Sequence, residues 1–417
     1  MQPARRPTIV FVHLTLGAQF EFFGQWLQRN GWDVHFVHAN ANPGFNPATG
    51  VRTWRFLPKK SGSAIEETFH TLTDAGYNAW AAGEVFHQMR QLEGIIPDVV
   101  MSHVGWGVGL MAKTIWPESL YIAYHEWYYG NIDWQSGRPS SPKVYPQLLD
   151  MRLRNLVISS EFDTAVRNWC PTHYPAAQFP PGLRSRIDVV PDGVDTRACR
   201  PDPDAVMDTD WLKLPKGRHV LTYATRGMEP LRGFPQFLAG LAELQKRRDD
   251  FSTVILADER VAYGTPLAPG DSWRIRMINA LDLDQRRLHV FPMRSRADYN
   301  KVLQVSTAHV YFTEPFVTSW SLTEAMATGC LVIGSNTAPV EEMLEDQENG
   351  ILVDMDDPEE IADMIEWAFD NPVEAALLRA QARETVIARY DAERVFAMKA
   401  DMLRELIAQH EGVAVPT

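Results

Sequence analysis

Two arginines in the second half of the chain are spaced for chemistry on a phosphate. The segment TRGMEPLRGFPQFLAGL (225–241) places Arg226 and Arg232 among glycines and prolines, directly before a helical pattern. Guanidinium groups beside a helix N-terminus suit a pyrophosphate, because they supply fixed bidentate donors next to the positive end of the helix. The same residues also fit an alternative in which both arginines form ordinary ion pairs on the surface.

Two carboxylates, Glu314 and Glu324, flank a hydroxyl-rich loop in EPFVTSWSLTEAMATGCLVIGSN (314–336). Ser321 and Glu324 have the spacing of a capping box, and Gly329 is placed to end the helix that they would start. Glu324 could therefore bond the first amide of its own helix. The preceding TSWS residues would also direct several backbone amides outward, which makes the loop a candidate anion cradle.

A third segment, YIAYHEWYYGNIDW (121–134), is unusually aromatic. His125 and Glu126 come just after an expected strand, and Trp127 and Tyr128 follow them. Aromatic faces pack against the C–H faces of sugars, while a His or Glu side chain bonds sugar hydroxyls, so we expect acceptor binding here. Packing of the aromatic side chains in the core is the alternative. Two adjacent potential ligands with no third nearby are a weak metal signal, and no metal site is expected.

The segment DVVMSHVGWGVGL (98–110) contains G-x-G-x-G after an expected strand. The spacing is wrong for the dinucleotide-binding G-x-G-x-x-G pattern, so a tight turn between strand and helix is the better interpretation. His103 and Trp106 lie at the end of that strand, where an acceptor or a sugar could stack.

The bulk properties exclude several classes of protein. A net charge of -13 argues against a nucleic-acid-binding protein. The three cysteines are far apart, so neither a disulfide framework nor a zinc site is expected and a reducing cytosol is the expected location. The N-terminal TIVFVHL run is better explained as a strand than as a signal peptide. No transmembrane helix is expected, but arginines with apolar neighbours over residues 151–169 leave contact with a membrane surface open.

Short apolar runs alternate with helical patterns along the whole chain, in two series. The first series of expected strands covers 8–14, 32–39, 97–103, 119–125 and 156–160, and the second covers 219–225, 252–258, 288–293, 308–314 and 331–336. Such alternation predicts parallel sheets covered by helices on both faces, and hence two doubly wound domains. Ligands of these folds lie beyond the carboxyl ends of the strands.

Taken together, these motifs resemble the retaining nucleotide-sugar glycosyltransferases of family 4. The resemblance covers nearly the whole chain and is strongest in SLTEAMATGCLVIGSNTAPVEEMLEDQENGILVD (321–354); it is also seen in TRGMEPLRGF, in VVPDGVDTRACRP and in the N-terminal segment FVHLTLGAQFEFFGQWLQRNGWDVHFV. It implies the GT-B fold, an α/β architecture of two Rossmann-like domains facing across a cleft. We expect an acceptor-binding domain over 1–200, a donor-binding domain over 201–390 and a C-terminal helix over 391–417 that packs back on the first domain.

The resemblance also implies roles for individual residues. As catalytic groups it implies His125 near the donor sugar, Arg226 and Arg232 on the donor diphosphate, and Glu314. For binding of the donor it adds Gly17 beside the diphosphate, Phe291, Pro292 and Met293 around the base, Thr318, Ser319 and Trp320 at the β-phosphate, and Glu324 on the ribose hydroxyls. The acceptor candidates remain His103, Trp106, Glu126, Trp127 and Tyr128.

One position departs from the family pattern. The family's two acids are separated by seven residues, which would put the first acid at Phe316, eight positions before Glu324. The nearest acid, Glu314, is ten positions before Glu324. The catalytic role of Glu314 therefore depends on a longer loop.

The function implied is transfer of a hexose, with retention, from a nucleoside-diphosphate sugar to a hydroxyl acceptor that is a saccharide, a lipid-linked molecule or a small molecule. No metal and no obligatory cofactor are expected. Envelope polysaccharide, glycolipid or glycoside biosynthesis in the cytoplasm, with possible peripheral contact at the inner membrane face, would suit such an enzyme. Two alternatives stay open: a nucleotide-sugar epimerase or hydrolase, and a catalytically degenerate binding subunit of the same fold.

Overall fold

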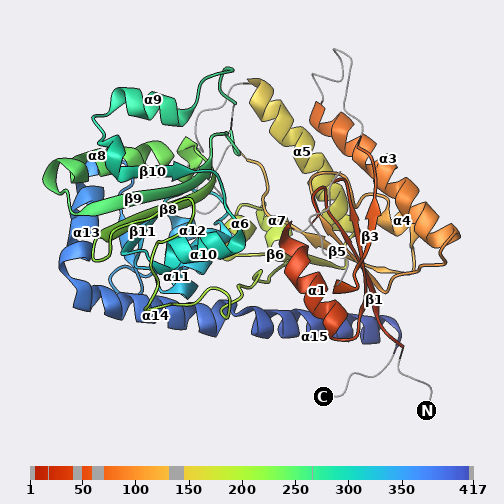
Figure 1. Cartoon of the computed structure of the whole chain (residues 1–417). Coiled ribbons are helices and arrows are strands. Elements are labelled where there is room, and N and C mark those ends of the chain that lie inside the picture. The colour runs from red at the N-terminus through yellow and green to blue at the C-terminus, as the bar shows by residue number, and fades with distance from the viewer. Residues whose placement is uncertain are drawn as a thin grey trace. The chain divides into compact units, whose positions relative to one another are not determined.

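The structure is a computed structural model that describes residues 5–16, 18–40, 49–58, 70–130, 145–264 and 266–412. The chain divides into two compact units (Figure 1). Unit 1 comprises Met1–Asp192 and Arg394–Thr417, and unit 2 comprises Gly193–Glu393.

Unit 1 is built on a parallel sheet with the strand order β3-β2-β1-β4-β5-β6-β7. Its strands are β1 (Thr8–Val12), β2 (Asp33–His38), β3 (Arg52–Arg55), β4 (Val99–His103), β5 (Leu120–Tyr124), β6 (Arg167–Cys170) and β7 (Ile187–Val189). The central strands are almost entirely buried, as continuous apolar runs in a doubly wound sheet should be. The strand order reverses between β1 and β4, which makes their carboxyl ends the switch point of this sheet.

Helices cover the sheet of unit 1, and the end of the chain supplies one of them. The helices are η1 (Ala18–Phe20), α1 (Glu21–Arg29), α3 (His70–Gln91), α4 (Ala112–Ile115), α5 (Tyr145–Thr164), α6 (His173–Ala177), α7 (Pro181–Arg184) and α15 (Ala392–His410). Phe396 of α15 packs against Phe23 and Trp26 of α1, with ring centroids 5.5 and 6.4 Å apart. The C-terminal helix is thus part of the core of unit 1, although it is distant in sequence.

Unit 2 contains a second parallel sheet, with the order β10-β9-β8-β11-β12-β13. The strands are β8 (His219–Gly227), β9 (Phe251–Asp258), β10 (Leu288–Phe291), β11 (Ala308–Tyr311), β12 (Val332–Ser335) and β13 (Ile351–Val353). The helices are η3 (Pro230–Arg232), α8 (Phe234–Arg247), α9 (Trp273–Ala280), η4 (Gln285–Arg287), α10 (Arg296–Gln304), α11 (Trp320–Thr328), α12 (Ala338–Glu341), α13 (Pro358–Asp370) and α14 (Pro372–Tyr390). Its strand order reverses between β8 and β11.

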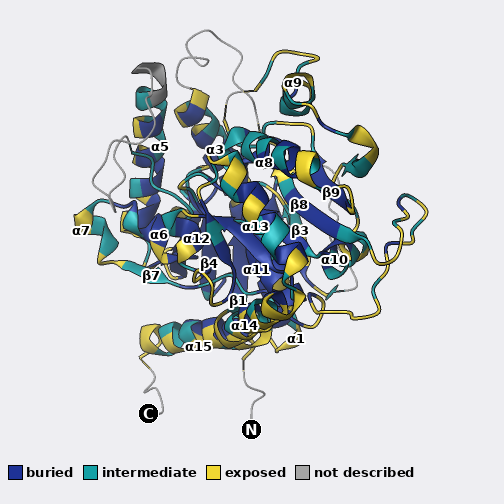
Figure 2. Cartoon of the chain, turned by 90° about the vertical axis from the view of Figure 1, so that its left-hand side faces the viewer, coloured by how far each residue is buried: buried dark blue, intermediate teal, exposed yellow. Residues whose placement is uncertain are grey.

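The sheet of unit 2 has an apolar layer on each face. Alternate residues of β8 enter different clusters: Leu221 and Tyr223 pack with α8 and α13, whereas Val220 and Ala224 pack with α10, α11 and α14. This alternation follows from the two-residue period of a strand. Figure 2 shows central strands such as β4 and β8 mainly in the dark blue of buried residues, while outer turns of helices such as α15 are yellow. The prediction of two doubly wound parallel sheets is confirmed.

Two local predictions were wrong. The run LVISS (156–160), predicted as a strand, lies within α5, where Val157, Ile158, Glu161 and Phe162 are buried at helical spacing. A five-residue segment with three apolar residues is too short for its period to distinguish strand from helix. Ser321 is also not the first residue of a capping box, because α11 begins at Trp320 with Ser319 as its N-cap. Within the described residues, no helix is long and apolar enough to cross a membrane.

Candidate functional site

The segment from the end of β8 to the start of α8 carries the two arginines that were predicted to bind a diphosphate. Arg226 is exposed near the end of β8, and Arg232 ends the short helix η3. Gly233 adopts a left-handed conformation with φ of 66° before α8 begins, a conformation that favours glycine. Gly227 is required for another reason, because a Cβ there would lie 2.5 Å from the Arg260 carbonyl oxygen.

Arg232 is a buried cation, only 5% exposed. Its Nη1 donates to Thr313 Oγ1 and to the Val317 carbonyl, both at 3.0 Å. Neither acceptor is charged, and within the part of the chain that the structure describes Arg232 forms no ion pair. A buried charge without a counter-ion is costly, so this position is suited to binding an anion from outside the chain.

Glu229, which sequence reasoning missed, lies fully buried in the same loop. Its Oε2 accepts hydrogen bonds from the backbone N–H groups of Ala262 and Tyr263, the latter at 2.8 Å. Burial raises the pKa of Glu229 despite these two bonds and the neighbouring Arg232. The carboxylate thus joins the arginine loop to the turn that follows β9.

The loop before α11 and the first residue of that helix were predicted to meet the β-phosphate. Thr318 and Ser319 are half-buried, and Trp320 is exposed. The Ser319 N–H donates to the Tyr311 hydroxyl at 2.7 Å, and Ser319 Oγ caps α11. The Ser319 amide is therefore already used inside the unit, and two amides of the first turn of α11 also have partners there: the Ser321 N–H donates to Ser319 Oγ at 3.4 Å and the Leu322 N–H to the Ser319 carbonyl at 3.1 Å.

The two acids of this segment lie in different surroundings. Glu324 is buried on α11 and forms an ion pair with Arg296 at the start of α10, a partner that sequence reasoning missed. Glu314 is half-buried, and its backbone N–H donates to the Leu231 carbonyl at 2.8 Å, which fixes it beside the arginine loop. No local sequence pattern indicates the Arg296 contact, because 28 positions separate it from Glu324.

The residues predicted to hold the base follow β10. Phe291 is half-buried and meets Trp211 edge-on, with ring centroids 4.8 Å apart. Arg294 lies over both rings, 4.8 Å from Trp211 and 5.1 Å from Phe291. Pro292 and Met293 are exposed beside this cluster. An aromatic and cationic surface of this kind can stack on a planar base.

In unit 1, His103 and Glu126 lie together at the switch point of the sheet. His103 Nε2 is 3.3 Å from Glu126 Oε2, and His103 Nδ1 is 3.2 Å from the Val104 carbonyl. Both ring nitrogens face oxygen acceptors, which favours the doubly protonated ring. Burial alone would lower the pKa of His103, but the charge and hydrogen bond of Glu126 outweigh it and raise the pKa.

His13, at the end of β1, is a further residue that sequence reasoning treated only as part of a strand. Its ring meets that of His103 edge-on, with centroids 4.7 Å apart. Its Nδ1 accepts from the Thr15 N–H at 2.8 Å and also lies 3.0 Å from the Thr15 carbonyl oxygen, so the ring is tied to the segment that follows β1. A histidine directly after the first strand, next to the switch point, is a sequence signal that could have identified His13 as a candidate site residue.

The remaining residues predicted in unit 1 are not all accessible. His125 is fully buried between Phe162 and Phe179, and its Nε2 is 2.8 Å from Asn168 Oδ1. Burial lowers its pKa to about 4, so the ring is neutral at pH 7. Half-buried Trp127 and Tyr128 follow it, and Trp106 is 39% exposed. Gly17 lies outside the described residues.

The glycine motif after β4 surrounds a buried carboxylate. Gly105 and Gly107 have φ of 93° and 79°, which agrees with a tight turn. A Cβ on Gly109 would collide with the Tyr121 hydroxyl and the Glu161 carboxylate. Glu161 accepts from Tyr121 Oη at 2.8 Å and from the Gly105 N–H at 3.2 Å. The glycines thus serve close packing around Glu161.

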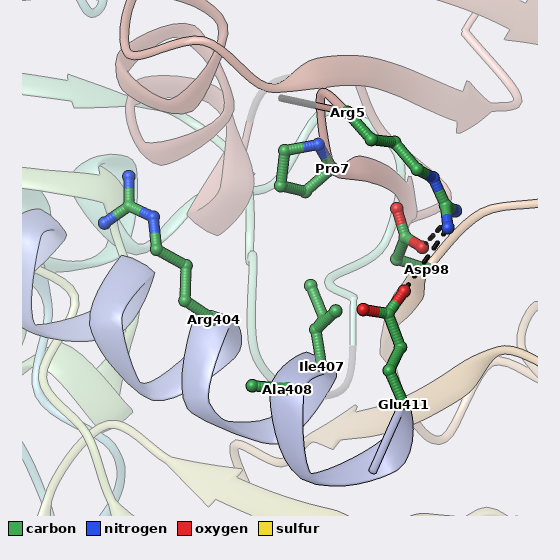
Figure 3. Close-up of a pocket in the computed structure, with 7 residues that line it drawn as sticks. All are labelled: Arg5, Pro7, Asp98, Arg404, Ile407, Ala408 and Glu411. Atoms are coloured by element: carbon green, nitrogen blue, oxygen red, sulfur yellow. Dashed lines mark hydrogen bonds and ion pairs between the residues drawn. The ribbon is translucent and has the colours of Figure 1, made fainter. Parts of the chain in front are cut away.

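A cavity of about 220 Å³ lies at the opposite edge of this sheet, where Pro7 precedes β1 and Asp98 precedes β4 (Figure 3). Arg5 pairs there with Asp98 at 2.5 Å and with Glu411 at 3.3 Å. These charged groups of the cavity are thus paired with one another within unit 1. The cavity also lies away from the carboxyl ends of the strands, where ligands of such sheets bind. Within the described residues, no group of three or more His, Cys, Asp or Glu side chains could hold a metal ion.

Comparison with known proteins agrees with the two-sheet fold. Residues 30–199 match the model described as "Glycosyl transferase family 4 group", and residues 215–385 match "Glycosyl transferases group 1". D-inositol 3-phosphate glycosyltransferase from Segniliparus rotundus is 24% identical, and the match covers 76% of each chain.

The fold is also similar to that of solved glycosyltransferases. Sucrose-phosphate synthase from Thermosynechococcus elongatus is 18% identical, with a TM-score of 0.72 over 97% of this chain and 100% of that one. HepE from Anabaena, solved in complex with UDP-glucose, is 13% identical, with a TM-score of 0.69 over 95% and 99%. With two successive family models matched and both sheets in place, the chain belongs to the family 4-like glycosyltransferases, with the GT-B fold.

Proposed function

We propose that this glycosyltransferase transfers a hexose from a nucleoside-diphosphate sugar to a hydroxyl acceptor, with retention of the anomeric configuration. The observation that carries the proposal is the buried Arg232 guanidinium, which has hydrogen bonds only to uncharged oxygens within the described chain. A diphosphate would supply the missing negative charge. HepE, a protein of similar fold, has been solved with UDP and with UDP-glucose, which supports a donor of this class.

In the proposed reaction, Arg232 and Arg226 stabilise the diphosphate as it leaves. The bond from the anomeric carbon to the phosphate oxygen breaks, and negative charge develops on the β-phosphate. Donors that are already positioned for this charge contribute more in the transition state than in the ground state. The N-terminal turn of α11, which contains Trp320, would face the same charge, with Thr318 and Ser319 shaping the loop before it.

The other donor contacts that we propose are those implied by the family resemblance. Glu324 binds the ribose hydroxyls, and Arg296 holds its carboxylate in place. Phe291, Pro292 and Met293 flank the base. Glu314, which is fixed beside Leu231, contacts the transferred sugar.

The acceptor is proposed to bind at the switch point of unit 1. The Glu126 carboxylate, held by a doubly protonated His103, can accept a hydrogen bond from an acceptor hydroxyl, and Trp106, Trp127 and Tyr128 offer apolar faces to a sugar. With retention, the acceptor oxygen attacks the face that the diphosphate leaves, and the departing phosphate oxygen takes the acceptor's proton. His125 supports this region from the core, where its side chain is fully buried.

Mass spectrometry of reactions with UDP-, GDP-, ADP- and dTDP-hexoses, each with and without a mixture of saccharide and lipid-linked acceptors, tests the proposal. We expect a glycosylated acceptor to form with at least one donor. Product formed equally well without an acceptor would indicate an epimerase or hydrolase instead. A protein that binds none of the nucleoside diphosphates by calorimetry would be a degenerate subunit.

The first variant to test is Arg232→Ala. Loss of one such donor typically lowers turnover about 100-fold to 1000-fold. Arg197→Ala, which removes an exposed arginine of the same unit, is the matched control and should leave turnover unchanged. Near-normal turnover of Arg232→Ala, in a protein that remains folded, would contradict the phosphate role.

A further inference from the structure

Two aromatic rings enclose the Arg232 guanidinium. Its Cζ lies 5.3 Å from the centroid of the Tyr263 ring and 5.6 Å from that of Phe316. The two rings also contact one another, with centroids 5.3 Å apart and an angle of 60° between their planes. Tyr263 belongs to the turn after β9 and Phe316 to the loop before α11, so three separate segments meet at this cation.

The turn that carries Tyr263 is attached to the arginine loop by a buried contact. Glu229 Oε2 accepts from the Tyr263 N–H at 2.8 Å and from the Ala262 N–H as well. Gly227 lets the same turn approach closely, since a Cβ there would be 3.0 Å from the Ala262 nitrogen. The sequence R-G-M-E-P-L-R (226–232) thus contains both the arginine and the residues that hold the turn of Tyr263 against its loop.

We propose that Tyr263 and Phe316 are positioning residues that fix the Arg232 guanidinium for the donor diphosphate, and that Glu229 fixes Tyr263 in turn. The proposal rests on the function proposed above. Aromatic rings attract a cation through their faces but do not neutralise it and offer no acceptor to its in-plane N–H groups. Because Nη1 is held by Thr313 and Val317, the edge formed by Nε and Nη2 is the one that would bind a pair of phosphate oxygens.

The same geometry gives Phe316 a role that an acid could not fill here. A carboxylate at this position would lie close enough to pair with Arg232 and would neutralise it before the donor binds. The two rings keep the guanidinium ordered and still charged. Most of the rotational freedom of a long arginine side chain is then lost in the free protein and does not oppose binding.

The test compares Tyr263→Leu with Tyr263→Phe in the full-length protein. Calorimetry with UDP, GDP, ADP and dTDP selects the diphosphate that binds most tightly, which is then measured beside its monophosphate and inorganic pyrophosphate. We expect Tyr263→Leu to weaken diphosphate binding about tenfold, to leave the monophosphate nearly unchanged and to lower kcat more than it raises KM. Tyr263→Phe keeps the ring and should behave as the native protein does.

A double-mutant cycle with Arg232→Ala separates this inference from the proposed function. If Tyr263 acts through Arg232, then Tyr263→Leu should have little further effect once Arg232 is alanine. Additive losses, or a Tyr263→Leu variant with native diphosphate affinity, would overturn the inference while leaving Arg232 as a phosphate ligand. If Arg232→Ala itself binds the diphosphate normally, the proposed function fails first.

Phe316→Glu gives an independent check, because it restores the acid that the family pattern would place there. The positioning role predicts at least tenfold weaker diphosphate binding, while Phe316→Tyr stays within about twofold of the native protein. Stronger binding or faster turnover in Phe316→Glu would show that the site lacks an acid and would overturn the role of the ring. Thermal unfolding of each variant confirms that the protein measured is folded.

Discussion

Glu161 provides a prediction that depends on no ligand. Its carboxyl group is 1% exposed beneath the glycine turn of unit 1. Burial raises its pKa to about 7, and the hydrogen bonds from Tyr121, Gly105 and Ser102, together with the charge of His103, only partly oppose the rise. The change to test is Glu161→Gln, which keeps the shape and an acceptor oxygen but cannot ionise.

The sign and size of the effect follow from the two pKa values. Below pH 4.5, the ordinary pKa of a glutamate, the group is protonated in both folded and unfolded chains. As the pH rises from there to about 7, the unfolded chain releases this proton while the folded chain retains it, so native stability falls and then levels off. At about 1.4 kcal/mol for each pH unit, the total loss is about 3 kcal/mol.

The measurement is urea unfolding of the full-length native protein and of Glu161→Gln between pH 4.5 and 8. Subtracting one pH profile from the other removes the contribution of every other titrating group. We expect the variant to gain relative to the native protein as the pH rises, by up to about 3 kcal/mol at pH 8. Infrared difference spectra should also show a protonated carboxyl band that disappears near pH 7 and is absent from the variant. A difference profile that is flat with pH would refute the buried, neutral carboxyl group.

Two further variants test packing and charge at the predicted sites. Gly109→Ala should destabilise the protein by about 1–3 kcal/mol in urea unfolding, because its Cβ would collide with Tyr121 and Glu161; the matched Gly182→Ala, where a Cβ meets nothing within 4 Å, should be within about 0.5 kcal/mol of native. Arg296→Ala should cost about 1 kcal/mol of folding stability by leaving the buried Glu324 without its ion pair, the half-exposed arginine keeping the cost small. Arg296→Lys, which retains the charge, should recover part of that loss, and an alanine variant as stable as the native protein would contradict the pairing.

The sequence predicted secondary structure best where a single hydrophobic pattern, that of a strand or that of a helix, extends over a long segment. Continuous apolar runs separated by helical patterns predicted both parallel sheets, because strands buried on two faces need apolar residues at every position. The prediction failed at LVISS (156–160), where the burial of α5 repeats every three to four residues and includes the polar Glu161. Polar residues in a buried helical face hide the period that would have identified it.

Within the site, sequence reasoning found residues that act through a local motif and missed those that act across the fold. Arg232 follows a strand and precedes a helix, so its place near a helix N-terminus could be predicted. Tyr263 reaches Arg232 from a turn after another strand, and Arg296 reaches Glu324 from another helix. No periodicity connects such pairs, because parallel sheets bring the ends of distant strands together.

The two units share one structural feature, a buried glutamate that holds a turn. In each unit, a turn at the carboxyl end of the parallel sheet has a backbone N–H group that a buried glutamate accepts from. In unit 1, Glu161 accepts from the Gly105 N–H, and in unit 2, Glu229 accepts from the Tyr263 N–H. Both carboxyl groups are buried, burial raises the pKa of both, and a nearby glycine makes room for the close approach.

Burying an ionised carboxyl group is unfavourable, because the group loses its hydration. The hydrogen bonds to Glu161 and to Glu229 offset part of this desolvation free energy. Backbone N–H groups in a turn need acceptors, and a side chain from the adjacent element can reach them without adding another loop. In unit 1, the turn that contains Gly105 follows His103 directly in the chain. In unit 2, the turn held by Glu229 carries Tyr263, whose ring packs against the Arg232 guanidinium. The glycines and glutamates of both motifs therefore act by holding in place the residues proposed to meet the acceptor and the diphosphate.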